Sequence, residues 1–248
     1  MTTSTLNRLV SSASIVLLFL VWQIYSVQVG NATLMPSVGD VFKRLIALLS
    51  DWDTYQILAT SVLRLLLSLG VAVILGMTLG LLSGINHQLE AFMQPIVVSI
   101  RTLPVISIII VLLILFGNSI TLYLIVLLLL FPIIYQSIMD GVKQTDPLLL
   151  DVVRLDSDHS NLDVLRLVYV PLSIPHLRTA LIDAVGLGFK VLIISEYIAQ
   201  TKVSIGREIY ISKVNLAFSD VFAWTLLLLF FVLILNKIVQ TILTPNIT

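Results

Sequence analysis

Three charged side chains lie inside an otherwise apolar segment, residues 179–200, and they are the first candidates for chemistry in this chain. They are Asp183, Lys190 and Glu196. A charge inside the hydrocarbon core of a membrane costs free energy, so each side chain should face protein or water. Asp183 and Lys190 are seven residues apart, which places them on one face of a helix and about 10 Å apart along its axis.

Residues that would indicate an enzyme are scarce. His87, His159 and His176 are far apart in the sequence, so we expect no metal site. The chain has no cysteine, which excludes disulfides and thiolate chemistry. It also lacks the G-x-x-x-x-G-K-[ST] phosphate loop, so it cannot bind and hydrolyse ATP through that motif. We therefore assign no catalytic residue.

Small residues recur at every fourth position in two segments. Gly76, Gly80 and Gly84 follow Ala72 in the first, and the second holds Ala180, Ala184 and Gly188. Each set lies on one slowly drifting helix face. Small side chains let helix backbones approach closely in membranes, so we expect helix packing rather than solute contact at these residues.

The composition defines the class of protein that must position these residues. Of 248 residues, 58% are hydrophobic and 11% are charged, and the mean hydropathy is +1.07. Average soluble domains are roughly 45–50% apolar and about 25% charged. The values exclude an ordinary cytosolic enzyme, a disordered tail and a basic nucleic-acid binder, and they predict an all-α protein integral to a lipid bilayer. The net charge is zero, so the total charge does not indicate an electrostatic partner.

The positions of the charges predict the membrane spans. About 20 apolar residues cross a bilayer. The longest charge-free stretch, 102–139, would be about 57 Å long as one helix, so we expect a turn at Gly117-Asn118-Ser119. The sequence thus predicts six spans, at about 10–28, 60–85, 96–116, 120–139, 179–200 and 219–242.

These spans organise the chain into three parts. Residues 1–29 are predicted to be a retained transmembrane helix, because the apolar run is long for a signal peptide and no A-x-A site follows. Residues 30–57 form an extracytoplasmic linker with a short amphipathic helix, and residues 58–243 form a core of five helices. Six spans place both termini on one side, and six basic residues against five favour the cytoplasmic side.

The segment 141–178 holds nine of the 28 charged residues. Asp146-Pro147 is typical of a helix start. A polar turn over 156–161 separates this first helix from a second, Leu162 to Val170, which Pro171 and Pro175 should end. From the pattern alone, the unit is equally well an interfacial helix pair lying on lipid or a docking element for a partner.

Short motifs from about Leu34 to Ile242 carry a family resemblance. They are Leu34-Met35-Pro36-Ser37, Thr60 to Arg64, the glycine-rich span, Gln94-Pro95, Arg101 to Pro104, Phe116-Gly117, Phe131-Pro132, Gly141-Val142, Glu196-Tyr197 and Ile205-Gly206. With these motifs the chain resembles the membrane subunits (permeases) of binding-protein-dependent ABC importers, and most closely the nitrate/sulfonate/taurine type. The resemblance implies a type I-like permease core.

In this family the counterpart of 141–178 is a loop whose coupling helix sits in a groove of a cytoplasmic ATPase. The consensus motif of the family has Glu-Ala-Ala where this chain has Asp151-Val152-Val153. Ser157 stands where the consensus has a glycine, and this chain has one extra residue before Pro171. The resemblance therefore implies a degenerate form of the motif. The residues it assigns to ATPase coupling are Asp151, Val152, Val153, Arg154, Ser157 and Asp158.

The resemblance also implies partners and a pathway. Two copies of the permease, or two related ones, form the pathway, an extracytoplasmic binding protein delivers the solute, and the partner ATPase holds ATP and Mg²⁺, so that this chain needs no cofactor. The location would be the cell membrane, multi-pass, with both termini cytoplasmic. The solute would be small and anionic or zwitterionic, of the sulfonate, nitrate, bicarbonate or vitamin-precursor class. Pathway candidates are Lys190, Glu196 and Arg101.

Other interpretations of the same residues remain open. Lys190 and Glu196 could each form a structural ion pair with another helix instead of lining a pathway. Arg64 and Arg101 lie near the ends of spans, where a long arginine side chain can extend its charge to the membrane interface. A secondary transporter driven by an ion gradient is the alternative function. Such transporters usually contain internal repeats with broken helices, and no repeat relates residues 1–120 to 121–248.

Overall fold

The computed structural model describes residues 3–146, 148 and 164–243. The predicted ATPase-coupling residues, 151–154, 157 and 158, lie outside the described residues. Across the described ranges the regular structure is helical and contains no strand, which confirms the all-α fold class.

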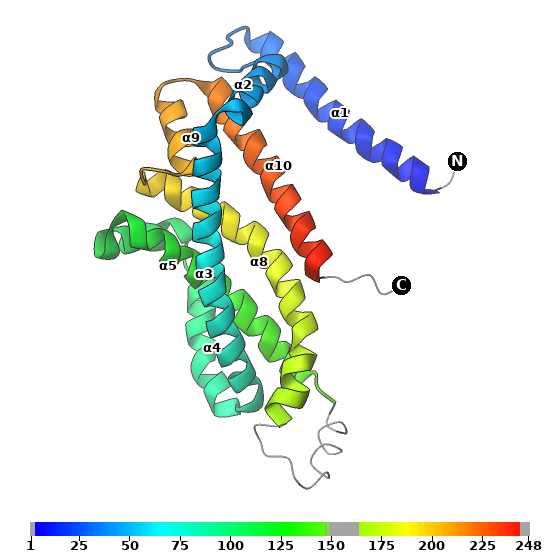
Figure 1. Cartoon of the computed structure of the whole chain (residues 1–248), viewed down its shortest axis with the longest axis vertical. Coiled ribbons are helices and arrows are strands. Elements are labelled where there is room, and N and C mark those ends of the chain that lie inside the picture. The colour runs from blue at the N-terminus through cyan, green and yellow to red at the C-terminus, as the bar shows by residue number, and fades with distance from the viewer. Residues whose placement is uncertain (1–2, 147, 149–163, 244–248) are drawn as a thin grey trace.

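The first helix, α1 (Thr3–Val29), begins away from the rest of the molecule and leads through a short turn into α2 (Val38–Ser50) (Figure 1). Side chains of α1 hold this turn. Trp22 Nε1 donates to the carbonyl of Pro36 at 3.1 Å, and Ser26 Oγ donates to the carbonyl of Met35 at 2.9 Å. The α1 helix is therefore anchored at one end, next to α2.

Helix α2 is amphipathic and begins at a side-chain cap. Ser37 Oγ accepts a hydrogen bond from the Asp40 amide at 3.1 Å, which satisfies one free N–H of the first turn. Val41, Leu45 and Leu48 follow at helical spacing and are buried, and the helix packs against α10 (Phe218–Leu243).

The predicted span 96–116 is not one helix. Helix α3 (Trp52–Ile85) is followed by α4 (His87–Thr102), and α5 (Val105–Lys143) begins only after Leu103 and Pro104. Proline has no N–H to donate and forces the residue before it into extended backbone. Leu103 accordingly has φ −66° and ψ 137°. The predicted span 96–116 is wrong because the lengths of apolar, charge-free stretches do not reveal that Pro104 separates two helices.

The turn predicted at Gly117 is present as a break inside α5. Gly117 has φ 72° and ψ 179°, which is not helical and which glycine adopts without a Cβ penalty. Residues 105–116 and 118–143 are thus two helical segments joined at this residue.

Pro171 and Pro175 do not end a helix as predicted. A π-helical turn, η1 (Leu165–Tyr169), continues directly into α8 (Val170–Ala199), and the Val170 amide donates to the carbonyl of Leu165. Pro171 lies in the first turn of α8, where a missing N–H costs least. Pro175 lies inside the same helix, so neither proline ends it.

Helix α9 (Ile205–Val214) and α10 complete the fold. Helix α3, the second segment of α5 and α8 pack along one another and form the centre of the molecule (Figure 1). We call the end where α2 and α9 lie the α9 end, and the opposite end, where α4 lies, the α4 end. The largest fully buried apolar side chains include Leu65, Leu122, Ile125, Leu130, Ile134, Tyr135 and Phe189.

Within the described residues, three helices are long and apolar enough to cross a membrane: α3, α5 and α10. The other predicted spans differ for identifiable reasons. Helix α8 carries Arg178 besides its three interior charges, α4 is only 16 residues long, and the apolar stretch of α1 is the shorter segment Ala13–Val29.

The glycine stripe of α3 faces the second segment of α5. A Cβ on Gly76 would lie 2.8 Å from Ile134 Cγ2, one on Gly84 would lie 2.6 Å from Val142 Cβ, and one on Gly80 would lie 2.7 Å from a backbone oxygen, that of Tyr135. Real Cβ atoms do not approach other atoms this closely. The two helix backbones therefore approach as closely as they do only because these side chains are absent.

Replacing Gly80 with alanine should lower the free energy of unfolding by about 1–3 kcal/mol, because the Tyr135 backbone cannot swing aside as a side chain would. Gly70→Ala is the matched control. It lies on the same helix, a Cβ there would meet no neighbouring group within 4 Å, and the change should raise stability by roughly 0.5–1 kcal/mol. Chemical unfolding in detergent measures both, and equal effects of the two variants would contradict the assigned contact.

Candidate functional site

A buried carboxylate, Glu196 of α8, lies at the centre of the best-connected polar cluster. Its side chain has no solvent exposure. The Oε1 atom accepts from Ser61 Oγ at 2.8 Å and from Arg64 Nη1 at 2.9 Å, and Oε2 accepts from the Gly206 amide at 3.2 Å. Three donors from two other helices therefore satisfy the carboxylate.

The local sequence explains why these donors converge. Ser61 and Arg64 are three residues apart on α3, so they project from one face of that helix. Gly206 lies in the first turn of α9, where backbone N–H groups are free and the helix dipole favours an anion.

Gly206 also brings α9 against α8. A Cβ at this position would lie 2.6 Å from the carbonyl oxygen of Ile193 and 2.6 Å from Glu196 Cβ. Any larger residue would push the start of α9 away and lengthen its hydrogen bond to the carboxylate.

Arg64 extends the cluster to the connection between α8 and α9. Its Nη1 atom also donates to the carbonyl of Val203 at 2.9 Å, and its side chain is 14% exposed. Removing one partner from a buried ion pair leaves an uncompensated charge, which costs about 3–5 kcal/mol. The cluster thus fixes α3, α8 and α9 to one another at the α9 end.

This geometry bears on two expectations about site residues. Glu196, which the sequence offers as a pathway candidate, has a carboxylate that is enclosed by protein and engaged by three donors. Arg64 is expected to extend its charge to the membrane interface, and instead it pairs with Glu196. The interhelical ion pair is the alternative that the sequence left open.

Arg101, the third pathway candidate, lies elsewhere. It lines a polar cavity of about 210 Å³ between α4 and α5. Lys143 donates to Glu90 at one side of this cavity, and the hydrogen bond lowers the pKa of that carboxyl. Gln136 Nε2 donates to Asp140 Oδ1 at 2.9 Å. Basic and acidic groups therefore alternate around the cavity.

Lys190 and Asp183 lie on an exposed stripe of α8. The stripe also contains Thr179, Leu187 and Ile194, whereas the opposite face, with Ala184, is buried against the core. Neither charge has an ion-pair partner in the part of the chain that the structure describes. Glu196, Arg101 and Lys190 are thus in three separate environments.

The sequence did not predict that Ser61, Arg64 and Gly206 are partners of Glu196. All of them belong to the motifs that carried the family resemblance, and the i, i+3 spacing of Ser61 and Arg64 was a visible signal of a shared face. Their pairing was missed because Arg64 and Glu196 are 132 residues apart in the chain. Within the described ranges, no three His, Asp or Glu side chains form a group that could hold a metal ion.

Comparisons with known proteins place the chain in a family. Residues 72–247 match the family model described as "Binding-protein-dependent transport system inner membrane component". The chain is 26% identical over 193 residues to the taurine transport system permease protein TauC of Escherichia coli, covering 75% of this chain and 70% of that protein. It is 30% identical over 132 residues to the formylaminopyrimidine transport permease protein ThiX of Halalkalibacterium halodurans, covering 52% of each.

Arg64→Met should lower the free energy of unfolding by roughly 3–5 kcal/mol, because it leaves the Glu196 carboxylate buried without a cation. Adding Glu196→Gln should restore part of this loss, since a neutral amide needs no counter-charge. Arg44→Met is the control, because it breaks an exposed ion pair with Asp220 that contributes about 0–1 kcal/mol. Chemical unfolding in detergent measures all three, and equal losses for Arg64→Met and Arg44→Met would refute the assignment.

Proposed function

Since the chain belongs to the family of binding-protein-dependent transport system inner membrane components, we propose that it forms the translocation pathway of an ATP-driven importer for a small anionic or zwitterionic solute. The chain is a multi-pass permease of an ABC importer of the nitrate/sulfonate/taurine type, and it is not an enzyme. ATP hydrolysis belongs to a partner ATPase, and the family implies a solute-binding protein as a second partner.

The exposed charges of α8 are the observation that carries the proposed pathway. Lys190 lies near the middle of a predicted span and projects away from the core of its own chain. A charge facing lipid at that depth would cost at least about 2.5 kcal/mol. The stripe with Lys190 and Asp183 therefore fits a face that borders water or protein rather than lipid.

A second copy of the permease would provide such an environment. Two-fold symmetry is the commonest arrangement of identical chains, and it would place the two α8 stripes on opposite sides of one shared path. Besides Lys190, each stripe carries Asp183 and otherwise small or apolar residues, so the two lysines would supply cationic groups and the two aspartates anionic groups along the path. This arrangement supports a homodimer around a path for a small anionic or zwitterionic solute.

The proposed contact with the ATPase lies at the α4 end. Helix α5 leaves the core there at Lys143, and the chain returns through Val164 and η1 into α8. A partner bound to 141–178 would therefore act on two central helices at once. We assign the contact to Asp151, Val152, Val153, Arg154, Ser157 and Asp158, and we infer that this end and both termini are cytoplasmic.

The names of the two relatives support the class of solute. TauC is named for taurine transport, and taurine is a zwitterion with a sulfonate group. ThiX is named for formylaminopyrimidine transport. The cationic side chain on the α8 stripe favours the sulfonate or a similar anion for this chain.

Lys190→Met should lower the uptake rate of an anionic solute by about tenfold, which corresponds to about 1.4 kcal/mol of lost charge stabilisation along the path. Lys190→Arg, which keeps the charge, should retain most of the uptake. Both variants should insert and assemble normally, because the side chain makes no ion pair within the described residues. Uptake into proteoliposomes measures the effect, and unaltered transport by Lys190→Met would refute the assigned role.

A further inference from the structure

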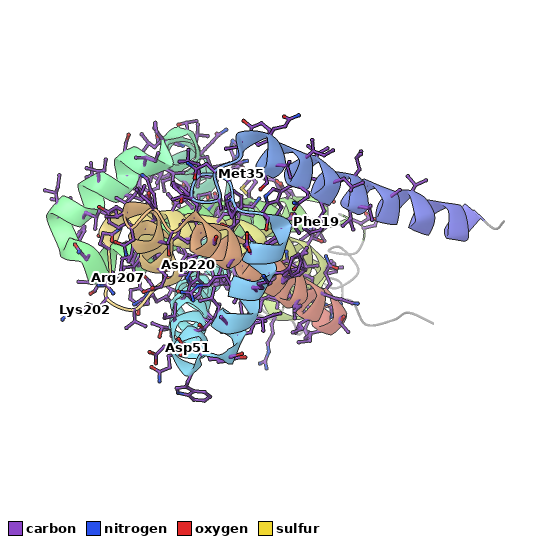
Figure 2. The ribbon with its side chains drawn as sticks, turned by 90° about the horizontal axis from the view of Figure 1, so that it is seen from above. Phe19, Met35, Asp51, Lys202, Arg207 and Asp220 are labelled. Carbon is purple, nitrogen blue, oxygen red and sulfur yellow. The ribbon has the colours of Figure 1, made fainter. Side chains whose placement is uncertain are left out.

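A second polar cavity lies at the α9 end, where α2, the start of α3, α9 and the start of α10 meet. Its volume is about 330 Å³. Figure 2 looks onto this end of the molecule and labels two of the lining residues, Asp51 before α3 and Asp220 on α10. None of the described residues of α5 or α8 lines it, so the cavity is separate from the stripe that we propose as the solute path.

Four carboxylates line this cavity, and only one of them is paired with a cation. Asp220 forms an ion pair with Arg44. Asp51, Asp53 and Glu208 have no ion-pair partner among the described residues. The polar cavity between α4 and α5 differs, because its two acidic side chains lie beside two basic ones. The electrostatic potential of the cavity at the α9 end therefore favours a cation.

The carboxylate of Glu208 is the least solvated of the three unpaired ones. Its side chain is partly buried, and burial raises the pKa of this carboxyl above its ordinary value. The positive charge of Arg207, the next residue of α9, acts in the opposite direction and offsets only part of the effect. A cation inside the cavity would stabilise the ionised form of Glu208, because an opposite charge nearby favours it.

Two buried hydroxyl groups in the cavity wall have no hydrogen-bond partner within the described residues. Thr54 is 2% exposed and Ser212 is 8% exposed, and both line the cavity. Their oxygens retain accessible surface, in contrast to the enclosed oxygen of Thr201. A buried hydroxyl without a partner is unfavourable, so both oxygens can accept a hydrogen bond from a ligand.

The remaining wall and the spacing of the carboxylates restrict the kind of cation. Leu48, Ile57, Ile211 and Trp224 provide apolar surface that would suit methylene groups. No three acidic side chains in the described part of the chain are close enough together to hold a metal ion. An ammonium group has three N–H donors that point in different directions, and it therefore fits acceptors that are spread around a cavity.

We propose that this cavity binds a primary ammonium group carried on a short aliphatic chain. Its N–H groups donate to the hydroxyl oxygens of Thr54 and Ser212 and to the carboxylate of Glu208, while Asp51 and Asp53 add negative charge. The methylene groups lie against the apolar wall. A small free amine and a lysine side chain of a partner protein offer the same chemistry. The site goes beyond the proposed function and does not depend on it.

Binding of radiolabelled n-butylammonium to the purified full chain in phosphatidylcholine nanodiscs tests the site directly. A scintillation proximity assay should show saturable binding. Glu208→Gln and Thr54→Val should each weaken it about tenfold, because each removes one acceptor from the cavity. Asp40→Asn on α2 and Thr60→Val on α3 are the matched controls and should leave the affinity unchanged, because neither residue lines the cavity.

The absence of saturable binding, or undiminished affinity in either Glu208→Gln or Thr54→Val, would overturn the proposal. Equal competition by tetramethylammonium would also overturn it, because that cation carries the charge but no N–H donor. Displacement of the probe by an equal concentration of Ca²⁺ would overturn it as well, because the cavity would then be a metal site.

The source of the ammonium group is identified in the same assay. In the proposed importer, this end faces away from the ATPase, so the partner would be the solute-binding protein. Displacement of the probe by that protein, lost when its lysines are acetylated, would support the site and identify a lysine as the ligand. Saturable binding that the protein does not displace would support the site for a free amine.

The binding assay needs no ATP, which separates the site from the proposed function. A preparation that accumulates solute with ATP but does not bind n-butylammonium would overturn the site alone. A preparation that binds the probe but takes up solute without ATP would support the site and contradict the importer function.

Discussion

The structure depends on one constraint, the need to satisfy a carboxylate that has no contact with solvent. Glu196 is stabilised only because Ser61, Arg64 and the Gly206 amide converge on it from α3 and α9. The donors belong to two helices other than its own, so the carboxylate fixes three helices in one arrangement. The same cluster holds the connection between α8 and α9 in place, through the bond from Arg64 to the carbonyl of Val203.

The two ends of the molecule consequently differ in how they are held. At the α9 end, a buried ion pair and a close glycine contact fix α8 to its neighbours. At the α4 end, the ion pair between Lys143 and Glu90 is exposed to solvent and contributes little, and α8 is held to α5 by a hydrogen bond from Ser137 Oγ to the carbonyl of His176 at 2.9 Å. In the proposed importer, a motion of the ATPase would pass from 141–178 to α8 and α5 together. The exposed stripe of α8 would then move relative to the second copy.

The sequence predicted the features that depend on composition and on local chemistry. The scarcity of charges indicated a membrane protein, and the glycine in a long charge-free run marked the break at Gly117. The prediction of the spans failed at Pro104, where two local signals compete. The hydropathy indicates one continuous apolar segment there, whereas the proline divides it into two helices. It also failed for contacts between distant segments. Nothing in the spacing of Arg64 and Glu196 indicates that they meet, because their pairing depends on how α3 and α8 pack.

In the proposed function, this chain moves its solute only when a separate ATPase hydrolyses ATP. Uptake into proteoliposomes that contain the permease, its ATPase and the binding protein tests this claim most directly. We predict accumulation that requires ATP, ceases when the ATPase is omitted, and is unaffected when proton and sodium gradients are abolished. Uptake by the permease alone, driven by an ion gradient without ATP, would contradict the claim and identify a secondary transporter.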